Sequence, residues 1–231
     1  MSRRKLRIER RFHGPPDSGN GGYVAGLVAG ALGGSDVTVT LHRPPPLDCW
    51  LDLRASDEAA ELLDGEERIA SAVGAAVDLD IPAAPPLDEA RAAEARYVGH
   101  HHHRFPSCFV CGPDRAPGDG LAIYPGETGG QVAATWTPGA DLADADCLVR
   151  REFLWAALDC PGYFAVEEAA GLALLGRMAA RIERDVPAGE PLIVTGWAIA
   201  GEGRKHHVGT ALHQPDGSLV AWARSTWITV A

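Results

Sequence analysis

The segment that most limits the possible folds is residues 21–32 (GGYVAGLVAGAL), where small or apolar side chains occupy nearly every position. This composition predicts a helix that is apolar on all of its sides, and such a helix has to be buried all round. Gly33 and Gly34 follow at the place where glycine commonly ends a helix. The rest of the chain must therefore wrap around this segment.

The residues around this helix predict strands. Residues 37–41 alternate with a period of two, which is typical of a half-buried strand, and three prolines at 44–46 end it. Residues 13–20 have the composition of a loop that leads into the helix. The other predicted elements are a first strand at 3–12, a strand at 49–54, a polar connection at 56–65 and a long strand at 67–79, for which a helix is the alternative.

The second half of the chain repeats this plan. Residues 148–160 (LVRREFLWAALDC) predict an amphipathic to apolar helix, and Pro161 and Gly162 predict its kink or its end. Residues 80–98, rich in proline, alanine and charge, predict a linker between the halves. The remaining predicted strands are 121–124, 131–136, 172–184, 191–200, 205–214 and, after the hairpin turn QPDG, 218–230.

One apolar helix with several strands in each half indicates an internal duplication of pattern. We therefore expect an α+β fold, in which two antiparallel sheets each wrap around a central apolar helix. The linker sets the predicted boundary, with residues 1–98 as the N-terminal unit and residues 99–231 as the C-terminal unit. A chain of 231 residues is long enough for two small domains.

Composition excludes several classes of function. The net charge of -10, from 21 Lys and Arg against 31 Asp and Glu, argues against a nucleic-acid surface. No stretch approaches the ~18 apolar residues of a membrane span, and no apolar signal segment follows the basic start. Five cysteines, an odd number, then predict free thiols and a cytoplasmic protein. Neither a phosphate-binding Gly-Lys-Ser/Thr loop nor a Gly-x-Ser-x-Gly elbow occurs.

Three stretches resemble hotdog-fold thioesterases, and in particular the double-hotdog chains that carry two such units. Residues 20–25 (NGGYVA) resemble the entry to the central helix of double-hotdog acyl-CoA thioesterases. Residues 108–112 (CFVCG), followed by 120–123 (GLAI), resemble the opening of many hotdog domains. Asp159, with Ala157, Leu158, Gly162 and Ala165 around it, resembles the central helix of phenylacetate-pathway-type thioesterases.

The resemblance implies that the site lies between two units, where one helix N-terminus polarises the thioester carbonyl and an acid from the facing helix acts on it. The two halves are complementary in this respect. The first supplies Asn20, Gly21 and Gly22, with Ala29 where the acid would stand. The second supplies Asp159, with charged residues at 150–152 in place of the glycines. We therefore expect one composite site, with the glycine amides as oxyanion donors and Asp159 as general base or nucleophile.

Each assignment has a structural alternative. Asp159 would be costly to bury in its apolar surroundings without a function, but it could instead cap the kink at Pro161. Asn20, the single asparagine of the chain, is a favoured helix N-cap and could also hydrogen-bond the substrate. Glu152 lies about two helical turns before Asp159, so it is either a reserve acid or a first-turn residue that stabilises the helix dipole.

Other residues are candidates for substrate binding. Tyr23 follows the two glycines, and Glu152 could face the same side as Asp159. Arg177 and His206, with Arg204, Lys205 and His207 near the latter, could contact the phosphates of coenzyme A, although ordinary charge at strand edges is the preferred explanation for most of them.

Four consecutive histidines, residues 100–103, stand close before Cys108 and Cys111, and these residue types are ligands of zinc. A tight turn beside a solvated histidine run is the alternative, and we expect neither a metal nor another cofactor.

These observations predict a thioesterase that hydrolyses an acyl-CoA or acyl-carrier thioester, as a monomer or a homodimer of double hotdogs. The alternative is a non-catalytic hotdog protein that binds an acyl or acyl-CoA ligand. A hotdog dehydratase ranks last, because its histidine-bearing motif is not visible at either helix start.

Overall fold

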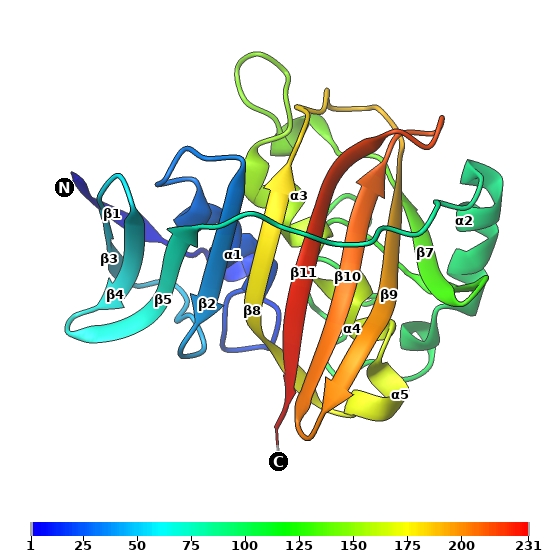
Figure 1. Ribbon diagram of the computed structural model, residues 1–231, viewed down its shortest axis with the longest axis horizontal. Helices are drawn as coiled ribbons and strands as arrows, with labels where there is room; N and C mark the ends of the chain where they lie inside the picture. The colour runs from blue at the N-terminus through cyan, green and yellow to red at the C-terminus, as the bar shows by residue number, and fades with distance from the viewer. Residues whose placement is uncertain (1, 231) are drawn as a thin grey trace.

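The computed structural model describes residues 2–230, and its eleven named strands form one antiparallel sheet (Figure 1). The strands are β1 (Ser2–Arg7), β2 (Asp36–Leu41), β3 (Trp50–Ala55), β4 (Ala59–Asp64), β5 (Glu67–Gly74), β6 (Gly126–Thr128), β7 (Gln131–Trp136), β8 (Ala173–Ile182), β9 (Leu192–Glu202), β10 (Lys205–His213) and β11 (Leu219–Thr229). Their order across the sheet is β1-β3-β4-β5-β2-β8-β11-β10-β9-β7-β6.

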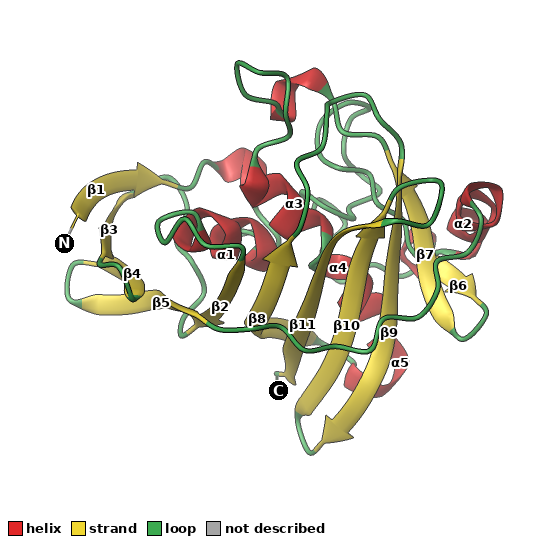
Figure 2. Ribbon diagram, turned by 45° about the horizontal axis from the view of Figure 1, so that its top comes forward, coloured by secondary structure: helices red, strands yellow, loops and turns green. Residues whose placement is uncertain are grey.

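The helices that matter for the site lie on one face of this sheet. They are α1 (Gly21–Ala29), α3 (Arg151–Ala157) and α4 (Cys160–Phe164), while α2 (Leu87–Ala93) and α5 (Glu167–Ala170) lie nearer its edges. Figure 2 shows the strands curving beneath α1 and α3, which pack against each other. No helix within residues 2–230 is long and apolar enough to cross a membrane.

The two halves of the chain share a single eleven-stranded sheet, whereas two separate sheets were expected. The five strands from residues 2–74 lie together on one side of the order, and the six strands from the second half lie on the other. They join where β2 pairs antiparallel with β8, from Asp36 opposite Arg181 to Thr40 opposite Arg177. Each of these strands would otherwise present an edge of unpaired backbone groups, and their pairing removes both edges.

Both central helices form inside the predicted segments 21–32 and 148–160 but are shorter, and the strand at 67–79 is confirmed over Glu67–Gly74. The polar connection predicted at 56–65 is wrong, because β4 occupies most of it and buries Ala60, Leu62 and Leu63. Residues 121–124 join no named strand; instead, the Leu121 N–H donates to the Phe109 carbonyl. The predicted linker is extended to residue 86, crosses the outer face of the sheet, and then forms α2 (Figure 1).

Glycines allow α1 and α3 to approach closely. A Cβ atom added to Gly22 would lie 2.6 Å from the Trp155 carbonyl oxygen and 2.6 Å from the Asp159 Cβ. One turn later, a Cβ on Gly26 would lie 2.6 Å from the Cα of Glu152. The contacts run in opposite directions along the two helices, which are therefore antiparallel. The small residues of α1 are needed to bring the end of α3 against the start of α1.

Candidate active site

Asp159 lies at the break between α3 and α4, where its backbone stands just before the first residue of α4. Its side chain does not cap that helix. Instead, its Oδ2 accepts two hydrogen bonds of 2.9 Å from the other half of the chain, one from the Gly22 N–H and one from the Asn20 side-chain amide. Capping of the kink therefore does not explain this carboxylate.

Asn20 both caps α1 and holds Asp159. Its Oδ1 accepts a hydrogen bond of 2.9 Å from the Tyr23 N–H, which satisfies one of the unpaired amides of the first turn. Its Nδ2 donates to Asp159 at 2.9 Å and approaches the sulfurs of Cys108 and Cys160 at 4.0 and 3.9 Å. The side chain is 2% exposed, so these contacts are shielded from water.

The other carboxylate oxygen of Asp159 is free. Oδ1 is buried and has no hydrogen-bond partner among residues 2–230. Burial raises the pKa of Asp159 to about 7, against the opposing effect of the hydrogen bonds from Gly22 and Asn20. A buried carboxyl group with a pKa near neutrality is suited to general acid–base chemistry.

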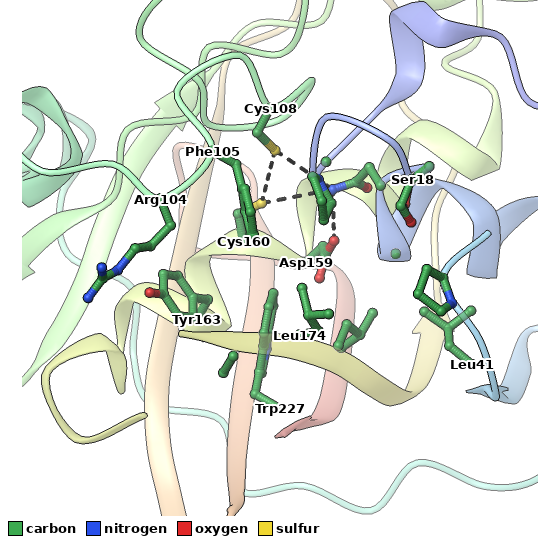
Figure 3. Close-up of a pocket in the computed structure, with 18 of the residues that line it drawn as sticks. Ser18, Leu41, Arg104, Phe105, Cys108, Asp159, Cys160, Tyr163, Leu174 and Trp227 are labelled. Atoms are coloured by element: carbon green, nitrogen blue, oxygen red, sulfur yellow. Dashed lines mark hydrogen bonds between the residues drawn. The ribbon is translucent and has the colours of Figure 1, made fainter. Parts of the chain in front are cut away.

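A cavity of about 210 Å³ lies beside this contact (Figure 3). Asn20, Gly21 and Asp159 supply part of its polar lining. Among the described residues, none accepts a hydrogen bond from the Gly21 N–H, so this first-turn amide is available to a ligand. Most of the wall is apolar or aromatic and includes Leu41, Pro44, Phe105, Tyr163, Phe164, Leu174, Leu175 and Trp227.

No protein-family model matches the sequence, and no curated protein matches it either. Solved structures do. The tesB protein of Mycobacterium avium subspecies paratuberculosis is 12% identical with a TM-score of 0.66, and the match covers 99% of this chain and 93% of that one. A protein of unknown function with a hot dog fold, from Alicyclobacillus acidocaldarius, is 11% identical with a TM-score of 0.66 over the same shares of the two chains. This chain has the hotdog fold.

A candidate thioesterase from Novosphingobium aromaticivorans has the same fold. It is 14% identical with a TM-score of 0.64, and the match covers 100% of this chain and 96% of that one. The resemblance to hotdog thioesterases found in three short motifs is thus confirmed for the fold over nearly the whole length of the chain.

The four residues that the sequence suggested for substrate binding do not line the cavity: Tyr23, Glu152, Arg177 and His206. Tyr23 is buried in an aromatic cluster, where its ring stacks on Phe12 at 4.3 Å between centroids. Glu152 packs beneath Gly26 and lies 3.7 Å from Arg150. Arg177 and His206 lie on strands β8 and β10, where the ring of His206 contacts Thr229 at 3.1 Å. The basic residues that do line the cavity are His42, Arg43, His103 and Arg104, and burial lowers the pKa of both histidines.

Three cysteines meet at the cavity, and only two of them were singled out by the sequence. Cys108 and Cys111 are joined by Cys160, the residue after Asp159, and all three are buried. Side-chain hydrogen bonds with Cys111 and Cys160 hold the pKa of Cys108 well below its ordinary value. Of the four consecutive histidines, only His103 lines the cavity. No local signal could have linked Cys160 to a motif about 50 residues earlier, because the link arises from tertiary packing.

Proposed function

We propose that this protein is a thioesterase that hydrolyses an acyl-CoA or acyl-carrier thioester at one composite site. One observation carries the proposal. The N-terminal end of α1, from the first half, contacts a buried carboxylate, Asp159, from the second half, beside an apolar cavity. The candidate thioesterase named among the proteins of the same fold supports the choice of reaction.

The start of α1 would bind the thioester carbonyl. Because the Gly22 N–H already donates to Asp159, the adjacent Gly21 N–H is the donor left for a substrate oxygen. It points from a helix end that carries partial positive charge, which stabilises the negative charge that develops on the oxygen. Gly21 has little room for a side chain, because a Cβ there would lie 2.9 Å from the Leu175 side chain.

Asp159 would act as the general base. Its Oδ2 is held by Asn20 and Gly22, so Oδ1 is the oxygen that can take a proton from water. The resulting hydroxide adds to the carbonyl carbon, the carbon–sulfur bond breaks, and the proton passes from Asp159 to the departing thiolate. A base with a pKa near neutrality both accepts and returns the proton readily.

The cavity would hold the acyl group. Its volume of about 210 Å³ is below the ~300–1,000 Å³ of sites for drug-sized ligands, which favours a small acyl group. Arg43 and Arg104, in place of Arg177 and His206, are the cationic side chains available to the phosphates of the thiol carrier. We propose two hotdog units, residues 1–98 and 99–231, each of which would supply one part of the site, so a single chain would suffice for activity.

The test is the release of free thiol from a panel of acyl-CoA thioesters by the wild-type protein and by Asp159→Asn. Asparagine keeps the shape of the side chain and an oxygen for both hydrogen bonds but removes the base, so the rate should fall by roughly 10²–10⁴-fold. Asp146→Asn, in an exposed loop, is the matched control and should leave the rate unchanged. Equal rates for Asp159→Asn and the wild type would contradict the assignment. An acyl ligand bound in the cavity with no turnover of any thioester would instead favour a non-catalytic binding protein.

A further inference from the structure

The three cysteines at the cavity form a compact group of sulfur atoms. The Sγ atoms of Cys108, Cys111 and Cys160 all lie within 4.8 Å of one another, and those of Cys108 and Cys160 are 3.8 Å apart (Figure 3). None of the three side chains belongs to the proposed hydrolytic step. The cluster therefore needs an explanation of its own.

The spacing fits coordination of one metal ion. Zinc binds thiolate sulfur at ~2.3 Å, so two sulfurs on one tetrahedral zinc are about 3.8 Å apart. The Cys108–Cys160 separation has this value. A disulfide would need ~2.05 Å between the sulfurs, and all five cysteines of the chain are free thiols in the structure.

One side-chain donor is directed at the sulfur cluster. The Asn20 amide approaches the sulfurs of Cys108 and Cys160, and N–H groups directed at sulfur favour the negatively charged form. The Tyr97 hydroxyl donates to the Cys111 carbonyl at 2.8 Å and holds the backbone that carries this cysteine. Gly112 closes the turn: a Cβ there would lie 2.5 Å from the Cys108 nitrogen, which explains why glycine follows the Cys-x-x-Cys pair.

We propose that Cys108, Cys111 and Cys160 bind one thiophilic metal ion, Zn²⁺, with the fourth coordination position facing the cavity. Three thiolates without a harder ligand select soft ions of this kind. All three cysteines line the cavity, so the ion has a path to the site and a water molecule can complete the coordination. His103 lines the same cavity, and its Nε2 has no partner within residues 2–230. Its Nδ1, however, accepts a hydrogen bond from the Phe105 N–H. A neutral imidazole that binds zinc through Nε2 carries its proton on Nδ1, so binding would break that hydrogen bond.

The ion would tie the segment 105–112 to the start of α4, one residue from Asp159. Metal binding to such a set contributes directly to folding stability, because the unfolded chain does not hold the three sulfurs together. The site does not depend on the proposed thioesterase reaction, since its ligands and its expected stability effect can be measured without any substrate.

The experiment measures the metal content of the full chain after exposure to Zn²⁺ and passage over a weak chelator. We expect about one zinc per chain for the wild type, and at least roughly 100-fold weaker binding for Cys160→Ser, because losing a direct ligand should exceed the ~10–100-fold effect of losing an outer-shell partner. Cys49→Ser and Cys147→Ser, outside the cluster, are matched controls and should bind like the wild type. Replacement of zinc by Co²⁺ in the wild type should add the near-ultraviolet sulfur-to-cobalt absorption of three thiolates, which keeps the test decisive if Cys160→Ser fails to fold.

Two results would overturn the proposal. One is a wild-type protein that stays metal-free or shows no sulfur-to-cobalt absorption. A disulfide between Cys108 and Cys160 would count as the same result. The other is zinc binding that Cys160→Ser leaves unchanged. Because neither measurement uses a thioester, a failure here is separate from a failure of the hydrolase assignment.

Discussion

Replacing Gly22 by alanine should separate the two central helices and displace Asp159. The added Cβ would stand 2.6 Å from both the Trp155 carbonyl oxygen and the Asp159 Cβ. Ordinary contacts of a Cβ begin at 3.4 Å, so the helices must part by about 0.8 Å (3.4 minus 2.6) or the carboxylate must move. One obstacle is a backbone atom, which cannot rotate away.

The cost follows from two opposing effects. Overpacking of this kind destabilises a protein by ~1–3 kcal/mol. Alanine also favours the helix over glycine by up to ~1 kcal/mol, so the net loss of unfolding free energy should be roughly 0–2 kcal/mol. The rate should suffer more, since a displacement of about 1 Å at a reacting group can cost ~10²-fold.

The assay is urea unfolding together with thioester hydrolysis. Gly30→Ala, at the end of the same helix, is the control for helix propensity, because its Cβ would make only ordinary contacts, with the Gly26 and Leu27 carbonyls at 3.4 and 3.7 Å. Gly22→Ala should be less stable than Gly30→Ala by roughly 1–3 kcal/mol. Gly26→Ala makes the same kind of clash away from Asp159 and should retain more activity. The reasoning is refuted if Gly22→Ala matches Gly30→Ala in both stability and rate.

Three further predictions concern other parts of the molecule. Asn20→Ser keeps a helix cap but loses the donor to Asp159, so hydrolysis should slow by roughly tenfold or more at nearly unchanged melting temperature. A hydrolysis rate equal to that of the wild type would contradict the positioning role of Asn20. The hydrogen bond from Lys5 lowers the pKa of Asp52, so the attachment of β1 is stabilised above the ordinary carboxyl pKa and weakens as pH falls through the folded-state pKa. The protection of the β1 amides from hydrogen exchange, relative to the unfolded chain at the same pH, should therefore fall in acid, and protection that does not change with pH would argue against this. Trp227→Phe enlarges the cavity and should shift the preference toward bulkier acyl groups, whereas an unchanged preference would place the acyl group elsewhere.

The buried helices could be predicted because their signal is local. A helix that is apolar all round must be enclosed, and α1 is enclosed on the predicted residues, with Asn20 as its cap. The β4 strand was missed because Glu61 and the flanking polar residues hide the buried Leu62 in a segment that reads as a loop.

Contacts between distant segments had no local signal. The pairing of β2 with β8 merges the halves into one sheet, and only the folded chain brings those strands together. Tyr23 looked like a ligand-binding residue because it follows two glycines, yet its direction is set by the aromatic rings of Phe12 and Phe153. The complementary motifs of the two halves predicted that Asp159 and Gly22 share one site. In the structure, the Asp159 side chain accepts a hydrogen bond from the Gly22 backbone amide.

The composite site is tested most directly by a crystal structure with an acyl-CoA ketone, in which a methylene group replaces the thioester sulfur and prevents hydrolysis. The account predicts the ketone oxygen about 3 Å from the Gly21 nitrogen, its acyl group in the cavity, and Asp159 Oδ1 facing the carbonyl carbon through a water molecule. A ligand whose carbonyl lies away from the start of α1, or is shielded from Asp159, would contradict it.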